Sequence, residues 1–90
     1  MYLCIPRVSA KTTKEFIYSR LCNLDIGSIE RISEFPLKND PTHKRIIFKI
    51  KWQNNETSKT AQKYLSNNNT INIVYDIPWF WKVVVTNQRI

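Results

Sequence analysis

Between residues 44 and 52, apolar and mostly cationic side chains alternate along the chain. The apolar positions are Ile46, Phe48, Ile50 and Trp52. The positions between them are Arg45, Ile47, Lys49 and Lys51. Successive side chains of a β-strand point to opposite faces, so this strand has one face for a core and one for solvent. The pattern predicts an antiparallel sheet that is covered on one side only.

The residues before this strand predict a strand followed by a helix. An apolar run over 2–5 predicts a short strand that Pro6 ends. Residues 12–15 have the form of a capping box, with Thr12 as the N-cap. An apolar stripe follows at i, i+4 and i+7: Ile17, Leu21 and Leu24. We expect this helix to end near residues 23–25.

The remaining elements follow from turn residues and apolar spacing. A strand is expected over 26–35, and a loop rich in Pro and Asn over 36–43. Asn54 or Asn55 can cap a second helix that runs to about residue 66. Strands over 71–75 and 80–86 are expected to form a hairpin.

This order of elements predicts the fold class. Two βαβ halves of this length pack two helices on one face of an antiparallel sheet. We therefore expect an α+β, ferredoxin-like βαββαβ sandwich. It would have a four-stranded antiparallel sheet, two helices on one face and an extra C-terminal hairpin strand joined through a turn at 76–78. The 90 residues correspond to a single domain, 1–90, ordered over about 2–86.

The charge balance favours a polyanionic partner. The chain has a formal net charge of +7 and a pI of about 9.7. Nucleic acid is the first candidate for such a chain, and an acidic protein or an anionic membrane surface is the second. We expect no signal peptide before the first strand, and no apolar segment of the sequence is long enough to span a bilayer. An intracellular protein with reduced thiols and no membrane association is expected.

Residues that catalysis or metal binding would need are few and scattered. Cys4 and Cys22 form no CxxC pair and His43 is the single histidine, whereas a structural zinc site needs four such ligands. A single glycine makes a phosphate-cradling loop implausible, and the acids form no paired motif for acid–base chemistry. We therefore expect no enzyme, no metal and no cofactor.

The chain resembles a divergent RNA-recognition motif. Residues 3–8 occupy the place of that family's RNP2 signature, and residues 45–52 occupy the place of RNP1. Arg45 matches the basic first position of RNP1, and Trp52 matches its aromatic last position. The positions of the base-stacking rings hold Ile47, Lys49 and, on the first strand, Cys4. The resemblance implies an RNA-binding sheet face that lacks the usual stacking rings.

A second resemblance concerns two short segments. Residues 74–83, with the sequence VYDIPWFWKV, and residues 4–8, with the sequence CIPRV, are similar to small uncharacterised proteins of large eukaryotic DNA viruses. The resemblance implies a viral setting inside an infected cell, in the host cytoplasm or nucleus. It implies no particular activity.

The first functional hypothesis is a binder of single-stranded RNA or another nucleic acid. Its candidate cations on or beside the open sheet face are Arg7, Arg31, Arg45, Lys49, Lys51 and Lys82. Ile47 shares this face, and Tyr2 and Phe80 are the rings expected to reach it. Such cations can follow a phosphate chain and release its counterions. The simpler alternative is a solvated polar face without a ligand.

The second hypothesis is a protein-interaction module, either an adaptor or a homodimer. Ile47, Trp79 and Phe80 would be its anchors, and the positive charge would steer an acidic partner. Trp79 has two interpretations, a cap over the end of the core or a protruding anchor, and the first is favoured. A virion component that coats the genome is a third possibility.

Overall fold

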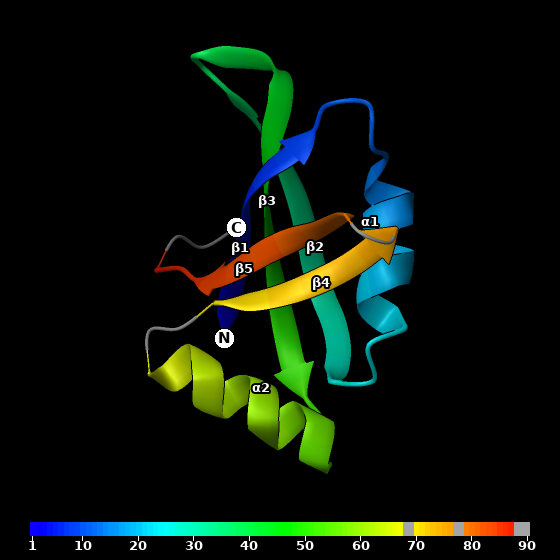
Figure 1. Ribbon diagram of the computed structural model, residues 1–90, viewed down its shortest axis with the longest axis vertical. Coiled ribbons are helices and arrows are strands. Elements are labelled where there is room, and N and C mark those ends of the chain that lie inside the picture. Colours follow the sequence, from blue (N-terminus) through cyan, green and yellow to red (C-terminus); the bar gives the residue numbers. More distant parts are fainter. Residues whose placement is uncertain (68–69, 77–78, 88–90) are drawn as a thin grey trace.

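The computed structural model describes residues 1–67, 70–76 and 79–87. Figure 1 shows the elements β1 (Tyr2–Ser9), α1 (Lys14–Cys22), β2 (Gly27–Leu37), β3 (Asp40–Trp52), α2 (Glu56–Ser66), β4 (Ile71–Asp76) and β5 (Trp79–Val85). The strands pair antiparallel in the order β2-β3-β1-β5-β4. The predicted α+β class is therefore confirmed. The element order is βαββαββ and the sheet has five strands, with β4 added at its edge.

Strand β1 is longer than predicted because Pro6 lies in a β-bulge. Ile5 pairs with Ile46 and Val8 pairs with Lys44, so Pro6 and the residue after it share one opposing position. A bulge leaves one residue outside the ladder, and proline, which has no N–H, is tolerated there. The strand therefore passes through Pro6 and continues to Ser9.

The predicted loop over 36–43 is wrong. Strands β2 and β3 continue as a long hairpin whose turn is Lys38 and Asn39, and this hairpin projects beyond the rest of the sheet (Figure 1). Asp40 organises its end, because its carboxylate accepts the backbone N–H of Thr42 at 3.0 Å and the Thr42 hydroxyl. A carboxylate that accepts a hydrogen bond from the backbone N–H two residues later stabilises a tight turn, so the chain forms a hairpin here instead of a loop.

The helix caps partly match the prediction. The N-cap of α1 is Thr13 instead of Thr12, and its hydroxyl accepts the Phe16 N–H at 3.1 Å. Asn55 caps α2 as expected, accepting the Ser58 N–H at 2.7 Å. The Asn55 amide also donates to the carbonyl of Asp25 at 3.0 Å, which ties the start of α2 to the turn after α1.

Both helices pack on the same face of the sheet. One buried cluster joins apolar residues of the helices to alternate residues of the strands. Its helix members are Ile17, Leu21, Ala61 and Leu65. Its strand members are Leu3, Ile5, Val8, Ile46, Phe48, Ile50, Ile73, Trp81 and Val83. The opposite face, which we call the open face, is left without a covering helix.

The single glycine lies where the pairing of β2 with β3 begins. Gly27 pairs with Trp52, and a Cβ at Gly27 would be 2.3 Å from the carbonyl oxygen of Lys51. No side chain fits at that distance without moving one strand. Gly27 therefore permits the pairing that begins the β2–β3 ladder.

Part of the prediction concerns positions that are not described. The expected turn at 76–78 includes residues 77–78, and the end beyond the expected ordered range of 2–86 includes residues 88–90; both stretches lie outside the described residues. Over the described ranges, neither helix has the length and apolar character needed to cross a membrane.

Candidate nucleic-acid interface

Strand register assigns each side chain to a face. Arg31 pairs with Lys49, which in turn pairs with Tyr2, so these three side chains form one row across β2, β3 and β1. The residues that register and alternation place on the open face of β2, β3, β1 and β5 are Ser28, Arg31, Ser33, Phe35, Arg45, Ile47, Lys49, Lys51, Tyr2, Cys4, Phe80, Lys82 and Val84. This face is the opposite of the one that carries the buried cluster.

The structure brings the predicted cations together on this face. Arg45, Lys49 and Lys51 follow one another on β3, with Arg31 beside them on β2. Lys82 lies across β1 on β5. The sixth cation, Arg7, lies in the bulge of β1. It precedes the buried Val8 and so points to the other face, where it extends the same surface. All six are thus on or beside one surface, as the alternation in the sequence predicts.

Acidic side chains near this surface lie at its margin or in the bulge of β2, where Glu30 precedes Arg31. None of the open-face residues that register identifies in the described ladders is an acid. Asp40 lies at the end of the hairpin, where it forms an ion pair with Arg7 and contacts His43 Nδ1 at 3.1 Å. Lys51 and Lys82 take part in no ion pair of the described residues. The positions of the face that the ladders assign therefore carry charge of one sign.

Tyr2 and Lys49 form a pair on adjacent strands. The Lys49 ammonium lies 5.9 Å from the centroid of the Tyr2 ring, within cation–π range. Both residues are half-buried. The contact holds the lysine against β1 and covers part of the ring. Tyr2 therefore lines the surface and also packs against a neighbouring side chain of the same face.

The centre of the open face is apolar and closed. Ile47 is 0% exposed and Cys4, its partner on β1, is 7% exposed. Ile47 therefore cannot act as the expected anchor, since a partner could not reach it without displacing the side chains around it. Burial raises the pKa of the Cys4 thiol, although Arg45 opposes this change. The thiol consequently stays protonated at neutral pH and behaves as part of an apolar floor.

Phe35 is an open-face ring that sequence reasoning missed. It pairs with Arg45 and is half-buried. The signal was present as alternation along β2, because Arg31, Ser33 and Phe35 occupy every second position. The expected strand over 26–35 included this ring, but the register shift between Ile29 and Arg31 interrupts the alternation that starts at the beginning of the strand. On the other side of the face, Phe80 is 46% exposed, as predicted.

Two hollows flank the bulge of β1 on this face. The larger, of about 450 Å³, is lined by residues that include Phe35, Lys38 and Arg45. The smaller, of about 240 Å³, is lined by residues that include Phe80 and Lys82. The two hollows share one side chain, Arg7. Each therefore combines an aromatic ring with positive charge.

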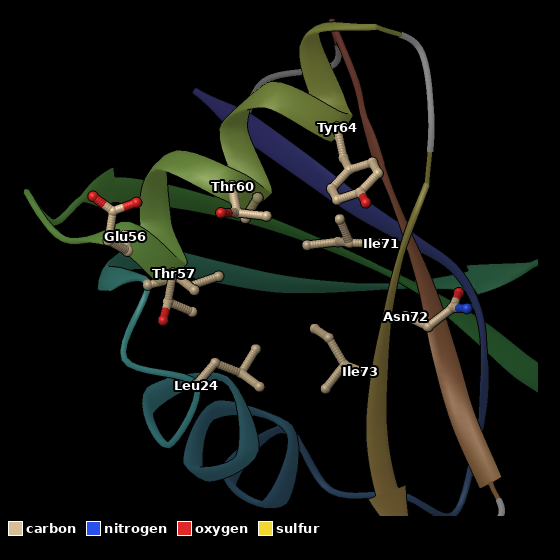
Figure 2. A pocket seen from close by; sticks show the side chains of 10 residues that line it. Leu24, Glu56, Thr57, Thr60, Tyr64, Ile71, Asn72 and Ile73 are labelled. Atoms are coloured by element: carbon tan, nitrogen blue, oxygen red, sulfur yellow. The ribbon is translucent and has the colours of Figure 1, made fainter.

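A third hollow lies on the helix side of the sheet. It is an apolar groove of about 460 Å³ between α2 and β4, closed at one end by Leu24. Figure 2 shows Tyr64 from α2 facing Ile71 from β4 across it. Cations are absent from its lining in the described part of the chain. This groove does not belong to the basic surface.

The remaining candidate residues lie apart from one another. Cys4 is buried and Cys22 is exposed, and both are free thiols. Trp79, which was expected to cap the core, is 63% exposed. Within residues 1–67, 70–76 and 79–87, no three His, Cys, Asp or Glu side chains gather where they could hold a metal ion. Comparison of the chain with protein-family models, curated proteins and solved structures finds no match.

Proposed function

We propose that this chain has an RNA-recognition-motif-like fold and binds single-stranded nucleic acid, RNA in the first place, on its open face. Strand order supports the fold. β3 lies between β1 and β2, and β1 lies between β3 and β5, which is the arrangement of two interlocked split βαβ units. Strand β4 is then an addition outside β5, and it leaves the face formed by β2, β3, β1 and β5 unchanged.

The observation that carries the functional proposal is charge of one sign across neighbouring strands. The cations span β2, β3 and β5, with an apolar floor at Ile47 and Cys4 between them. A phosphate chain that crosses the strands meets a cation on each of these strands and releases counterions at every contact. Because the contacts are to phosphate, binding should depend strongly on salt and weakly on sequence.

Aromatic rings at the margins supply the second contribution. Phe35 and Phe80 are on opposite sides of the cations, on β2 and β5. Base–aromatic stacking tolerates any base, because every base has a π-face. The Tyr2 ring is half-buried and already contacts Lys49, so the rings at the margins would hold bases while the cations between them hold phosphates.

Charge reversal on the face is the direct test. Lys49→Glu combined with Lys51→Glu should remove measurable binding of a labelled oligouridylate of about 12 nucleotides at about 150 mM salt. The matched control is Lys59→Glu with Lys63→Glu on α2, which changes the net charge equally on the helix side. Binding by the control variant at near wild-type affinity would support a localised site.

Salt dependence gives an independent measure. Each phosphate contact on a single strand contributes about 0.7 to the slope of log affinity against log salt. Lys51→Ala alone should therefore reduce the slope by about 0.7. Failure of the wild-type protein to bind single-stranded RNA or DNA even at about 50 mM salt would reject the proposal.

A second candidate function, protein interaction, is favoured by exposed apolar side chains on the β4–β5 hairpin. Val74 is 56% exposed and pairs with Phe80, and Trp79 follows at 63%. Aromatic anchors of this kind are enriched at protein interfaces. Sedimentation of the protein at increasing concentration tests self-association, and Trp79→Ala with Phe80→Ala should abolish it. A strict monomer would count against the homodimer.

A further inference from the structure

The larger open-face hollow has the composition of a nucleotide pocket. Its volume of about 450 Å³ falls in the range of small-molecule sites. The half-buried ring of Phe35 lines it, together with the cations Arg7, Lys38 and Arg45. A ring next to several cations matches a base attached to a phosphate, because the ring stacks and the guanidinium groups bind the phosphate oxygens in pairs.

We propose that this hollow is a subsite for one nucleotide of the bound strand, with its base on Phe35 and its phosphate at Arg7 and Arg45. The proposal rests on the proposed function, since it specifies where a bound single strand is held. The positions are set by backbone structure. Phe35 and Arg45 are a direct cross-strand pair, and the bulge of β1 directs Arg7 toward them.

The Arg7–Asp40 ion pair controls access to the phosphate position. Asp40 contacts Arg7 and receives hydrogen bonds from the Thr42 N–H and hydroxyl. The Thr42 hydroxyl, with smaller effects of His43 and Arg7, holds the pKa of this carboxyl below its usual value. An incoming phosphate must therefore compete with a carboxylate for Arg7. The guanidinium is exposed and can exchange one oxyanion for the other.

The smaller hollow fixes the direction of the strand. It shares Arg7 with the Phe35 hollow and lies beside Phe80 on β5. Three strand spacings separate β2 from β5, which corresponds to about 14 Å at about 4.8 Å per spacing. A strand that runs across the sheet, perpendicular to β1, would place one base in each hollow and a phosphate near the shared arginine.

Removing the ring while keeping the charges tests the subsite. Phe35→Leu should lower affinity for an oligouridylate of about 12 nucleotides roughly tenfold, the magnitude of one lost stacking contact. On an abasic strand of the same length, Phe35→Leu and wild type should bind equally, because that strand has no bases to stack. Tyr64→Leu is the matched control, since it removes an exposed ring from α2 on the helix side.

The outcomes separate the subsite from the proposed function. Equal affinity of Phe35→Leu and wild type for oligouridylate, with binding still lost in the Lys49→Glu, Lys51→Glu variant, overturns the subsite and retains the binding face. An equal loss on the abasic strand also overturns it, because the effect would then be structural. Absence of binding by the wild type on either strand rejects both.

A second variant tests the competition at Arg7. Asp40→Asn can still accept the Thr42 hydrogen bonds but removes the charge that holds Arg7. Affinity for oligouridylate should rise about threefold at low salt, and the gain should vanish when Arg7→Gln is combined with it. An unchanged or lower affinity of Asp40→Asn, with the fold intact by circular dichroism, would contradict the role of the ion pair.

Discussion

Ile46 and Ile47 are adjacent residues of the same type, and both are 0% exposed, yet they lie on opposite faces of β3. Ile46 belongs to the buried cluster beneath the helices. Ile47 pairs with Cys4 and Ser33 on the open face, where no helix packs. Its cover must therefore come from side chains of the same face. Burial alone does not distinguish a core position from the floor of a binding surface; strand register does.

The two environments differ in the side chains that surround each isoleucine. On the helix side, apolar groups from both helices and four strands fill the space around Ile46. On the open face, the residues two positions away along β3 are Arg45 and Lys49. Long cationic side chains can lay their methylene stems over an apolar neighbour while the charge remains in water. The open face is therefore closed by groups that a ligand can move.

The largest expected effect is the loss of stability on shortening either isoleucine, and it tests directly whether the two environments differ. Ile46→Ala should lower the free energy of unfolding by about 4 kcal/mol, because the packed surroundings leave a cavity. Ile47→Ala should cost about 2 kcal/mol, because flexible side chains can close over the space. Urea denaturation of both variants measures the difference. Equal losses would show that the open face is packed as rigidly as the core.

The second prediction concerns the pairing of β2 with β3, whose register assigns each side chain to one of the two faces. Gly27→Ala would place a Cβ against the Lys51 carbonyl oxygen and force β2 and β3 apart where their pairing begins. We expect a loss of about 2 kcal/mol, a typical cost of forcing atoms into an occupied site. Ser28→Ala is the control at the next position, which is exposed. A loss below about 0.5 kcal/mol would mean that the strands separate there at little cost.

The division between faces could be predicted from the sequence because it depends on alternation within one strand. Ile46, Phe48 and Ile50 enter the core, and Arg45 and Lys49 lie opposite, as period-two spacing requires. The second helix and its cap at Asn55 were also predictable, because capping is a local interaction. Local patterns therefore determined the α+β class and the cationic candidates.

The parts that could not be predicted depend on contacts between distant residues. The hairpin end is held by Asp40 and Arg7, which are 33 positions apart, so composition alone suggested a loop. The burial of Ile47 and the exposure of Trp79 depend on how neighbouring strands cover each face. Alternation assigns a face to a residue but does not determine how much of that face remains accessible.

A third and smaller effect distinguishes two lysines of the open face. Lys49→Ala removes the cation–π contact with Tyr2 and should cost about 0.5 kcal/mol of stability. Lys51→Ala, at an exposed position, should change stability by less than that. Both should weaken nucleic-acid binding to a similar extent, since each removes one phosphate contact. If the two variants had equal stability, the contact between Lys49 and Tyr2 would contribute nothing to the fold.

The smallest expected effect concerns the acid at the margin of the open face. The Thr42 hydroxyl, followed by smaller effects of His43 and Arg7, lowers the pKa of Asp40 in the folded protein. A carboxyl with a lowered folded-state pKa stabilises the fold above its unfolded pKa and loses this contribution as pH falls through the folded value. The melting temperature of the wild type should therefore exceed that of Asp40→Asn slightly at about pH 6, and the gap should close below about pH 4. Thr42→Val should reproduce most of the gap, because the hydroxyl is the main cause of the shift. A gap that stays constant from about pH 6 to about pH 2 would show that Asp40 acts through its shape instead of its charge.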